Sequence, residues 1–229
     1  MHTILSIFAY VVDTIFPKSC EWCGKAGVFL CEECLLRAPR AELMNNSSSK
    51  PDSFITAIFN YQNTEIRGVI WKFKYKNARG IAKHFGGVLY DEIIGEVSDD
   101  IRLSTSDVFL LVPIPLHKKR LRERGYNQSE LLAREILKYA DRQTSKKIFD
   151  LLPNALLRTR ATKPQAKKEK RVARFENLRG AFVASPELVR GRHIILIDDV
   201  TTTGATLSEA RKVLLKSGAK TVRAYAVAH

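Results

Sequence analysis

The chain has 229 residues, of which 45% are hydrophobic and 27% are charged, so it can bury a full core. This composition excludes an intrinsically disordered chain. The length predicts one domain of ordinary size plus a small additional segment. The 38 Lys and Arg residues outnumber the 24 Asp and Glu residues, and the net charge of +14 predicts attraction to polyanions such as nucleic acid, anionic lipid or phosphorylated small molecules.

The first segment, residues 4–15, is apolar along one helical face. It predicts an amphipathic helix that packs on the protein, with docking on a membrane surface as the alternative. No basic region precedes it, no small-residue cleavage site follows it, and it is too short to cross a bilayer. We therefore expect a cytoplasmic protein with no transmembrane segment.

Four cysteines follow in two C-x-x-C pairs, and the chain contains no others. Two such pairs can present four thiolates to one tetrahedral ion, which predicts a structural Zn²⁺ knuckle, with iron as the main rival because sulfur ligation alone does not choose the metal. Two disulfides are the alternative, but they are rare in chains without a secretion signal, and a redox pair would not occur twice. The expected ligands are Cys20, Cys23, Cys31 and Cys34.

A turn-rich stretch at 45–52 predicts a boundary between an N-terminal helix with the cysteine segment, residues 1–50, and an α/β domain, residues 51–229. Strand and helix alternate from residue 108 onward, which predicts a parallel sheet with crossover helices. We expect strands at 54–61, 108–112, 181–184, 193–197 and 221–227, and helices at 65–74, 79–94, 129–139 and 207–216, the last ending at Gly218.

The positive charge is concentrated in three runs. Residues 66–83, 117–124 and 158–174 carry net charges of +6, +4 and +7. A single run of this kind is typical of a solvated helix face, but three runs around one phosphate motif favour an anion-binding function.

Aromatic residues alternate with lysines in the first of these runs. Trp71, Phe73 and Tyr75 follow the pattern of proteins that stack the bases of single-stranded nucleic acid. The same residues can instead be the core residues of a helix, and we expect this of Trp71 and Phe73.

The strongest motif spans residues 194–206, where an apolar strand runs into two carboxylates, a threonine-rich turn and a helix. The turn can direct backbone N–H groups and hydroxyls at a phosphate, and the helix adds its positive N-terminus. Asp198 and Asp199, the candidate catalytic pair, can accept hydrogen bonds from the vicinal hydroxyls of a ribose, directly or through Mg²⁺. A simple helix cap would explain one acid and one threonine but not the whole string. The candidate ligand-binding residues of the turn are Thr201, Thr202, Thr203, Gly204, Ala205 and Thr206.

This string resembles the fingerprint of type I phosphoribosyltransferases. Other stretches, together with the four-cysteine N-terminus, resemble the ComF family of competence-associated proteins, and the likeness covers nearly the whole chain. The residues that carry this second resemblance are 112–117, Arg120, 124–133, Arg171, Asn177 and 180–182.

The resemblance implies a type I phosphoribosyltransferase-like parallel sheet flanked by helices. It implies that phosphoribosyl pyrophosphate binds with Mg²⁺, its ribose hydroxyls on the two aspartates and its 5′-phosphate in the turn that follows them. The turn at 113–120 would then be the pyrophosphate loop, with Lys118 and Arg120 as charge partners. The basic stretch at 160–171 occupies the place of a mobile loop that closes over the substrate, and an exposed loop without that role is the alternative.

The resemblance further implies a cytoplasmic protein of natural transformation that handles incoming single-stranded DNA, alongside other competence proteins. Two other functions remain open: an active phosphoribosyltransferase on an unknown acceptor, and a regulator that binds the sugar phosphate without turning it over. No recognisable acceptor site is present in the sequence. The candidate DNA contacts are Lys163, Lys167, Lys168, Lys170 and Arg171.

Overall fold

The computed structural model of the chain describes residues 19–41, 54–103, 108–160 and 178–229. The predicted first helix at 4–15 and the turn-rich stretch at 45–52 lie outside these residues. The division of the chain near residue 50 therefore stays a prediction.

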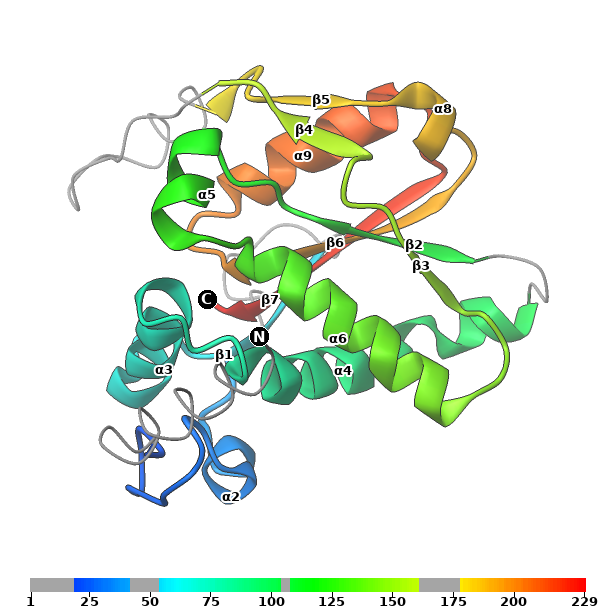
Figure 1. Ribbon diagram of the computed structural model, residues 1–229. Helices are drawn as coiled ribbons and strands as arrows, with labels where there is room; N and C mark the ends of the chain where they lie inside the picture. Colours follow the sequence, from blue (N-terminus) through cyan, green and yellow to red (C-terminus); the bar gives the residue numbers. More distant parts are fainter. Residues whose placement is uncertain (1–18, 42–53, 104–107, 161–177) are drawn as a thin grey trace, which may run out of the picture.

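A sheet of five parallel strands lies at the centre of the molecule, in the order β1-β7-β6-β2-β3 (Figure 1). The predicted parallel sheet is confirmed. The strand β6, which carries the two carboxylates, is the central one. The strands are β1 (Ile55–Phe59), β2 (Phe109–Pro113), β3 (Phe149–Leu151), β6 (His193–Val200) and β7 (Thr221–Ala228). A separate antiparallel hairpin pairs β4 (Leu156–Arg158) with β5 (Phe182–Ala184).

Helices cover both faces of this sheet (Figure 1). On one face lie α3 (Thr64–Tyr75), α4 (Ile81–Leu103) and α6 (Gln128–Gln143), and on the other lie α9 (Ala205–Lys216) and the β4–β5 hairpin. The short helices α2 (Glu32–Leu36), α5 (Lys118–Arg124) and α8 (Pro186–Val189) were not predicted. Within the part of the chain that the structure describes, no helix is long and apolar enough to span a bilayer.

The central strands read as continuous apolar runs because both of their faces are buried. In β2 and β6 alternate residues point into two separate cores, one under α4 and α6 and the other under α9 and the hairpin. The first core contains Phe109, Leu111, Ile195 and Ile197, and the second contains Leu110, Val112, Ile194 and Leu196.

The cysteine segment, residues 19–41, packs against the edge of β1 and against α3. The Ala41 N–H donates to the Ile58 carbonyl over 2.8 Å, and the Asn60 N–H donates to the Pro39 carbonyl over 3.0 Å. The Glu21 carboxylate forms an ion pair with Lys72 of α3. The segment and the α/β domain therefore share one core on this side of the sheet.

Candidate functional site

Two adjacent carboxylates lie at the end of β6. The Asp199 residue is only 8% exposed, and its Oδ1 atom lies 2.9 Å from the ammonium nitrogen of Lys74, which comes from α3. Asp198 accepts hydrogen bonds on its own Oδ1 from the Ser129 hydroxyl at 3.1 Å and from the Asp199 N–H at 2.9 Å. Helices α3 and α6 thus hold the carboxylate pair in place from one side.

The ionisation of Asp198 is strongly perturbed. Burial, and after it the neighbouring Asp199 carboxylate, raise the pKa of Asp198 to about 7 against the opposing effects of the Lys74 ammonium and the hydrogen bonds from Asp199 and Ser129. Asp198 therefore changes charge near neutral pH. Hydroxyl donors or a cation at this position would favour its ionised form.

Backbone hydrogen bonds hold the turn after β6 at both of its ends. The Thr201 N–H donates to the Ala228 carbonyl over 3.0 Å, and the Ser208 N–H donates to the Gly204 carbonyl over 2.8 Å. Gly204 has a φ of 71°, and a Cβ atom there would lie 3.0 Å from the Cδ1 atom of Ile55. No described side chain caps α9, so its first N–H groups are not occupied by a capping side chain. A strand, a turn and a helix N-terminus follow one another here, an order in which backbone N–H groups can bind an anion.

Arg158 on β4 lies within electrostatic range of Asp198 and of a second arginine, Arg120. Burial lowers the pKa of Arg158 on β4, and so does the nearby charge of Arg120 on α5, whereas Asp198 raises it. Lys118 and Arg120 are both exposed, and they lie on a helix that begins at Lys118 rather than in the predicted turn through residue 120. The predicted DNA contacts, Lys163, Lys167, Lys168, Lys170 and Arg171, lie outside the described residues.

The stretch 124–133, quoted above for its family likeness, ties three elements together around the carboxylates. The Tyr126 hydroxyl donates to the carbonyl of Phe73 at the end of α3. The Asn127 side-chain amide donates to the Ile114 carbonyl over 3.0 Å, just after β2, and the following Ser129 reaches β6. These residues therefore position the site, a role that sequence reasoning did not give them.

The residues that sequence reasoning missed are those whose partners lie far away in the chain. Lys74 and Arg158 belong to two of the basic runs, but charge alone does not show that they turn inward. The interpretation of the aromatics was right for Phe73, which is fully buried, and wrong for Trp71, which is 49% exposed. The buried face of α3 is set by Ile66, Val69, Ile70 and Phe73, which puts Trp71 on the opposite side.

The four cysteines form a cluster whose sulfur atoms all lie within 4.8 Å of one another. The Cys31 sulfur is 3.7 Å from that of Cys20 and 3.6 Å from that of Cys23. Four sulfurs at about 2.3 Å from a tetrahedral ion are about 3.8 Å apart, whereas a disulfide requires about 2.05 Å. The spacing therefore fits one metal ion, and none of the four cysteines forms a disulfide.

The electrostatics of the cluster differ between its members. Burial disfavours the Cys20 thiolate, but N–H groups of Cys23, Cys31 and Trp22 outweigh this effect and lower its pKa to about 6. Burial and the neighbouring sulfurs raise the pKa of Cys34. Thiolates packed this closely repel one another, which a shared cation relieves.

Comparison with known proteins agrees with this geometry. Residues 142–229 match the phosphoribosyl transferase domain family. DNA utilization protein YhgH of Escherichia coli O157:H7 is 29% identical over 212 residues, which are 90% of this chain and 88% of the relative. Competence protein F of Haemophilus influenzae is 27% identical over 222 residues, or 92% and 86% of the two chains.

A third relative, competence protein ComFC of Bacillus subtilis, is 39% identical over 132 residues, which are 56% of this chain and 49% of that protein. The matched domain includes the central strand β6, its carboxylates and the turn into α9. The four-cysteine cluster precedes this domain in the chain. These relatives support a ComF-family protein, and the chain has a phosphoribosyltransferase-type fold.

Proposed function

We propose that this protein binds phosphoribosyl pyrophosphate together with Mg²⁺ and handles single-stranded DNA in the cytoplasm during natural transformation. The observation that carries the first part is the pair Asp198 and Asp199 at the end of the central strand, directly before the turn into α9. Ligands of parallel α/β folds bind at this edge of the sheet. The printed names of the relatives, DNA utilization protein and competence protein, support the second part.

In this proposal the two aspartates accept the ribose hydroxyls, and the turn from Thr201 to Thr206 surrounds the 5′-phosphate. The pyrophosphate faces Lys118 and Arg120, with Arg158 within electrostatic range of Arg120. When bound, Mg²⁺ would supply positive charge to the pyrophosphate oxygens. Protein cations then need to neutralise only the remaining negative charge.

The metal at the four cysteines is proposed to be zinc. Its role would be to stabilise a segment that is too small to fold by itself. Other competence proteins are proposed as partners, on the strength of the family alone.

Thermal unfolding tests the ligand proposal. Saturating phosphoribosyl pyrophosphate with Mg²⁺ should stabilise the wild type by about 2.7 kcal/mol at a hundredfold excess over Kd. Asp198→Asn together with Asp199→Asn should abolish this shift, whereas Asp141→Asn, the same change on the exposed side of α6, should leave it intact. A wild type that does not respond at millimolar ligand contradicts the proposal.

Salt dependence tests the DNA proposal. Each phosphate contact lowers the slope of log affinity against log salt by about 0.7 for a single strand. Replacing Lys167, Lys168, Lys170 and Arg171 together by Gln should flatten this slope without lowering the melting temperature. If the variant loses only its affinity for phosphoribosyl pyrophosphate, these residues serve the sugar phosphate and not DNA.

The family match also favours a second candidate function, phosphoribosyl transfer to an unknown acceptor. In that reaction the acceptor would form a bond to the anomeric carbon while the bond to pyrophosphate breaks. Pyrophosphate release with a panel of nucleobases and amines distinguishes the two candidates. Release that depends on both an acceptor and Asp198 would establish an enzyme.

A further inference from the structure

Two aromatic side chains on the outer side of α3 are not explained by packing. Trp71 and Tyr75 are 49% and 58% exposed, although large aromatic residues usually contribute to a core. They lie one helical turn apart, with ring centroids at 6.0 Å and an interplanar angle of 46°. Both rings therefore present a large surface to solvent.

One cation lies over each of these rings. The Lys76 ammonium lies 5.3 Å from the centre of the Trp71 ring, and the Arg124 guanidinium of α5 lies 5.2 Å from the centre of the Tyr75 ring. Arg124 also donates to the Tyr75 hydroxyl over 3.3 Å, which joins α5 to α3.

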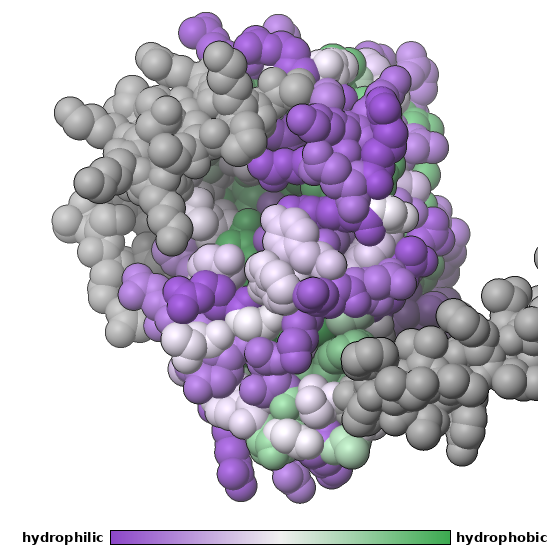
Figure 2. Space-filling view, turned by 60° about the vertical axis from the view of Figure 1, so that its left-hand side comes forward, coloured by the Kyte–Doolittle hydropathy of each residue, from purple (hydrophilic) through white to green (hydrophobic). Residues whose placement is uncertain are grey.

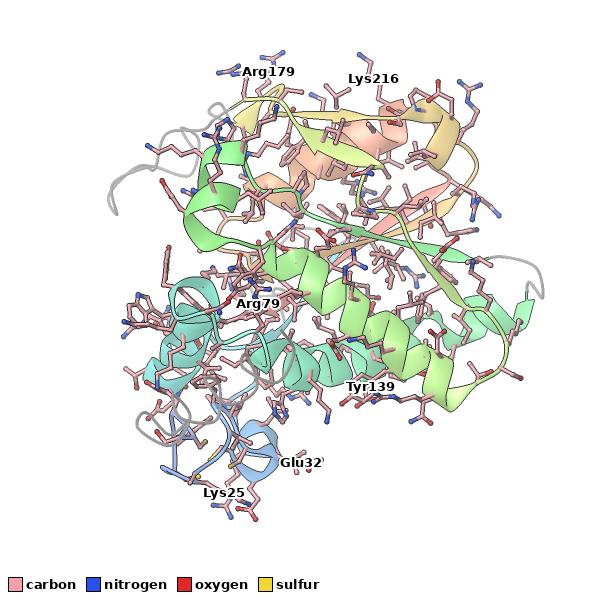
Figure 3. The ribbon with its side chains drawn as sticks, viewed as in Figure 1. Lys25, Glu32, Arg79, Tyr139, Arg179 and Lys216 are labelled. Atoms are coloured by element: carbon pink, nitrogen blue, oxygen red, sulfur yellow. The ribbon has the colours of Figure 1, made fainter. Side chains whose placement is uncertain are left out.

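Arg79, in the turn after α3, extends the same arrangement. Its guanidinium lies 4.7 Å from the centre of the Tyr126 ring, and Figure 3 shows it near the junction of α3, α5 and α6. We call Trp71, Tyr75, Lys76, Arg79 and Arg124 the α3–α5 face. Figure 2 shows the side of the molecule that carries α3 and α5, where strongly hydrophilic residues border paler residues of intermediate hydropathy.

We propose that the α3–α5 face binds the unpaired bases of a nucleic acid strand, which stack on Trp71 and Tyr75 while the three cations neutralise the strand's phosphates. This inference rests on the proposed DNA-handling function and gives it a location. Every base has a flat π-surface, so stacking of this kind binds a strand without reading its sequence. Neutralised phosphates release counterions, which adds affinity that depends on salt.

The charge of the face argues against an apolar protein partner. Such a partner would remove three cations from water without offering them negative charge. A single strand offers both flat rings and phosphates, and thus matches both components of the face.

Helix α3 also contributes to the candidate sugar-phosphate site. Lys74, between Phe73 and Tyr75 on the same helix, turns the other way and contacts Asp199. Helix α3 therefore supplies residues both to this face and to the carboxylate site.

Two oligomers of equal length and charge test the inference, a thymidine oligomer and an abasic oligomer that has the same sugar-phosphate backbone without bases. The wild type should bind the thymidine oligomer about tenfold or more tightly than the abasic one. Trp71→Ala with Tyr75→Ala should reduce this ratio to near one and leave the abasic affinity unchanged. Trp71→Phe with Tyr75→Phe keeps both rings and should retain most of the preference.

Fluorescence gives an independent measurement, because the chain has only two tryptophans. In a Trp22→Phe background, thymidine oligomers should quench Trp71 and abasic oligomers should not. Equal wild-type affinity for both oligomers, or a double Ala variant that keeps the preference, overturns the inference but leaves DNA handling intact. A wild type that binds neither oligomer refutes DNA handling itself. Loss of phosphoribosyl pyrophosphate affinity instead of DNA affinity in the double Ala variant would assign the face to the other ligand.

Discussion

At the scale of single residues, Asp198 should make the stability of the protein depend on pH. Its pKa is about 7 in the folded chain, because it is buried beside Asp199, and an unfolded aspartate ionises near pH 4, at about 3.9. Between these values the folded state holds a proton that the unfolded state has lost, so stability falls as pH rises.

Asp198→Asn removes this titration, so the variant should gain stability relative to the wild type as pH rises from about 5 to about 8, by roughly 1–3 kcal/mol. Urea unfolding of both proteins at the two pH values measures the difference. The variant should be the more stable protein and yet bind phosphoribosyl pyrophosphate poorly. A constant difference across this pH range would show that Asp198 titrates like an ordinary exposed aspartate.

Lys74 is the counter-ion of a carboxylate that has little access to water. Lys74→Met should destabilise the protein by about 3 kcal/mol, because the Asp199 charge stays buried without its partner. Adding Asp199→Asn should recover most of that loss. Lys72→Met is the matched control on the same helix, and its more exposed pair with Glu21 predicts a loss below about 1 kcal/mol. Similar losses in the two Met variants would contradict this account of the Lys74 pair.

At the scale of elements, the turn between β6 and α9 depends on Gly204. Ala at this position has to adopt a φ of 71° and meets Ile55, so we expect a loss of about 1–2 kcal/mol and a weaker ligand-induced thermal shift. Gly95→Ala is the control, since a Cβ there in the middle of α4 meets nothing within 4 Å and should stabilise the helix by about 0.5–1 kcal/mol. Calorimetry of the two variants with and without ligand checks both effects.

The long periodic elements could be predicted from the sequence, whereas most of the short ones, β5 excepted, could not. The apolar runs of β2 and β6 and the one-sided helix α6 carry patterns that continue for several residues. Helix α4 extends beyond the predicted residue 94, since Val97 continues its buried stripe. The strands β3 and β4 have three residues each, too few for a period to appear.

The residues of the candidate site also divide into those that could be predicted from the sequence and those that could not. The string from Asp198 to Thr206 is continuous in sequence, so its residues could be named in advance. The contacts of Lys74 and Ser129 with the carboxylates, and the electrostatic influence between Arg158 and Asp198, arise only when α3, α6 and β4 are placed around β6. The local sequence pattern contains no information on how these elements are placed around β6.

At the scale of the whole molecule, the metal cluster should contribute to stability more than to ligand binding. Cys31 lies in the core that continues into α3, so Cys31→Ser or chelation should lower the free energy of unfolding by at least about 3 kcal/mol, which is roughly 6–12 °C in Tm. Elemental analysis should find about one zinc per chain before chelation. Native disulfides found by mass spectrometry, or a Tm that chelation does not change, would contradict this assignment.

Four consecutive residues of helix α3 lie in four different environments. Lys72 meets the cysteine segment, Phe73 enters the core, Lys74 reaches Asp199, and Tyr75 faces solvent beside Arg124. Each added or removed residue turns the following part of a helix by about 100°, so a change of length would exchange all four surroundings at once. Insertions and deletions in this helix should therefore be selected against during evolution, even where single side chains can vary. One alanine inserted after Ile70 should be more damaging than Trp71→Ala, with loss of fold, metal and sugar-phosphate affinity together.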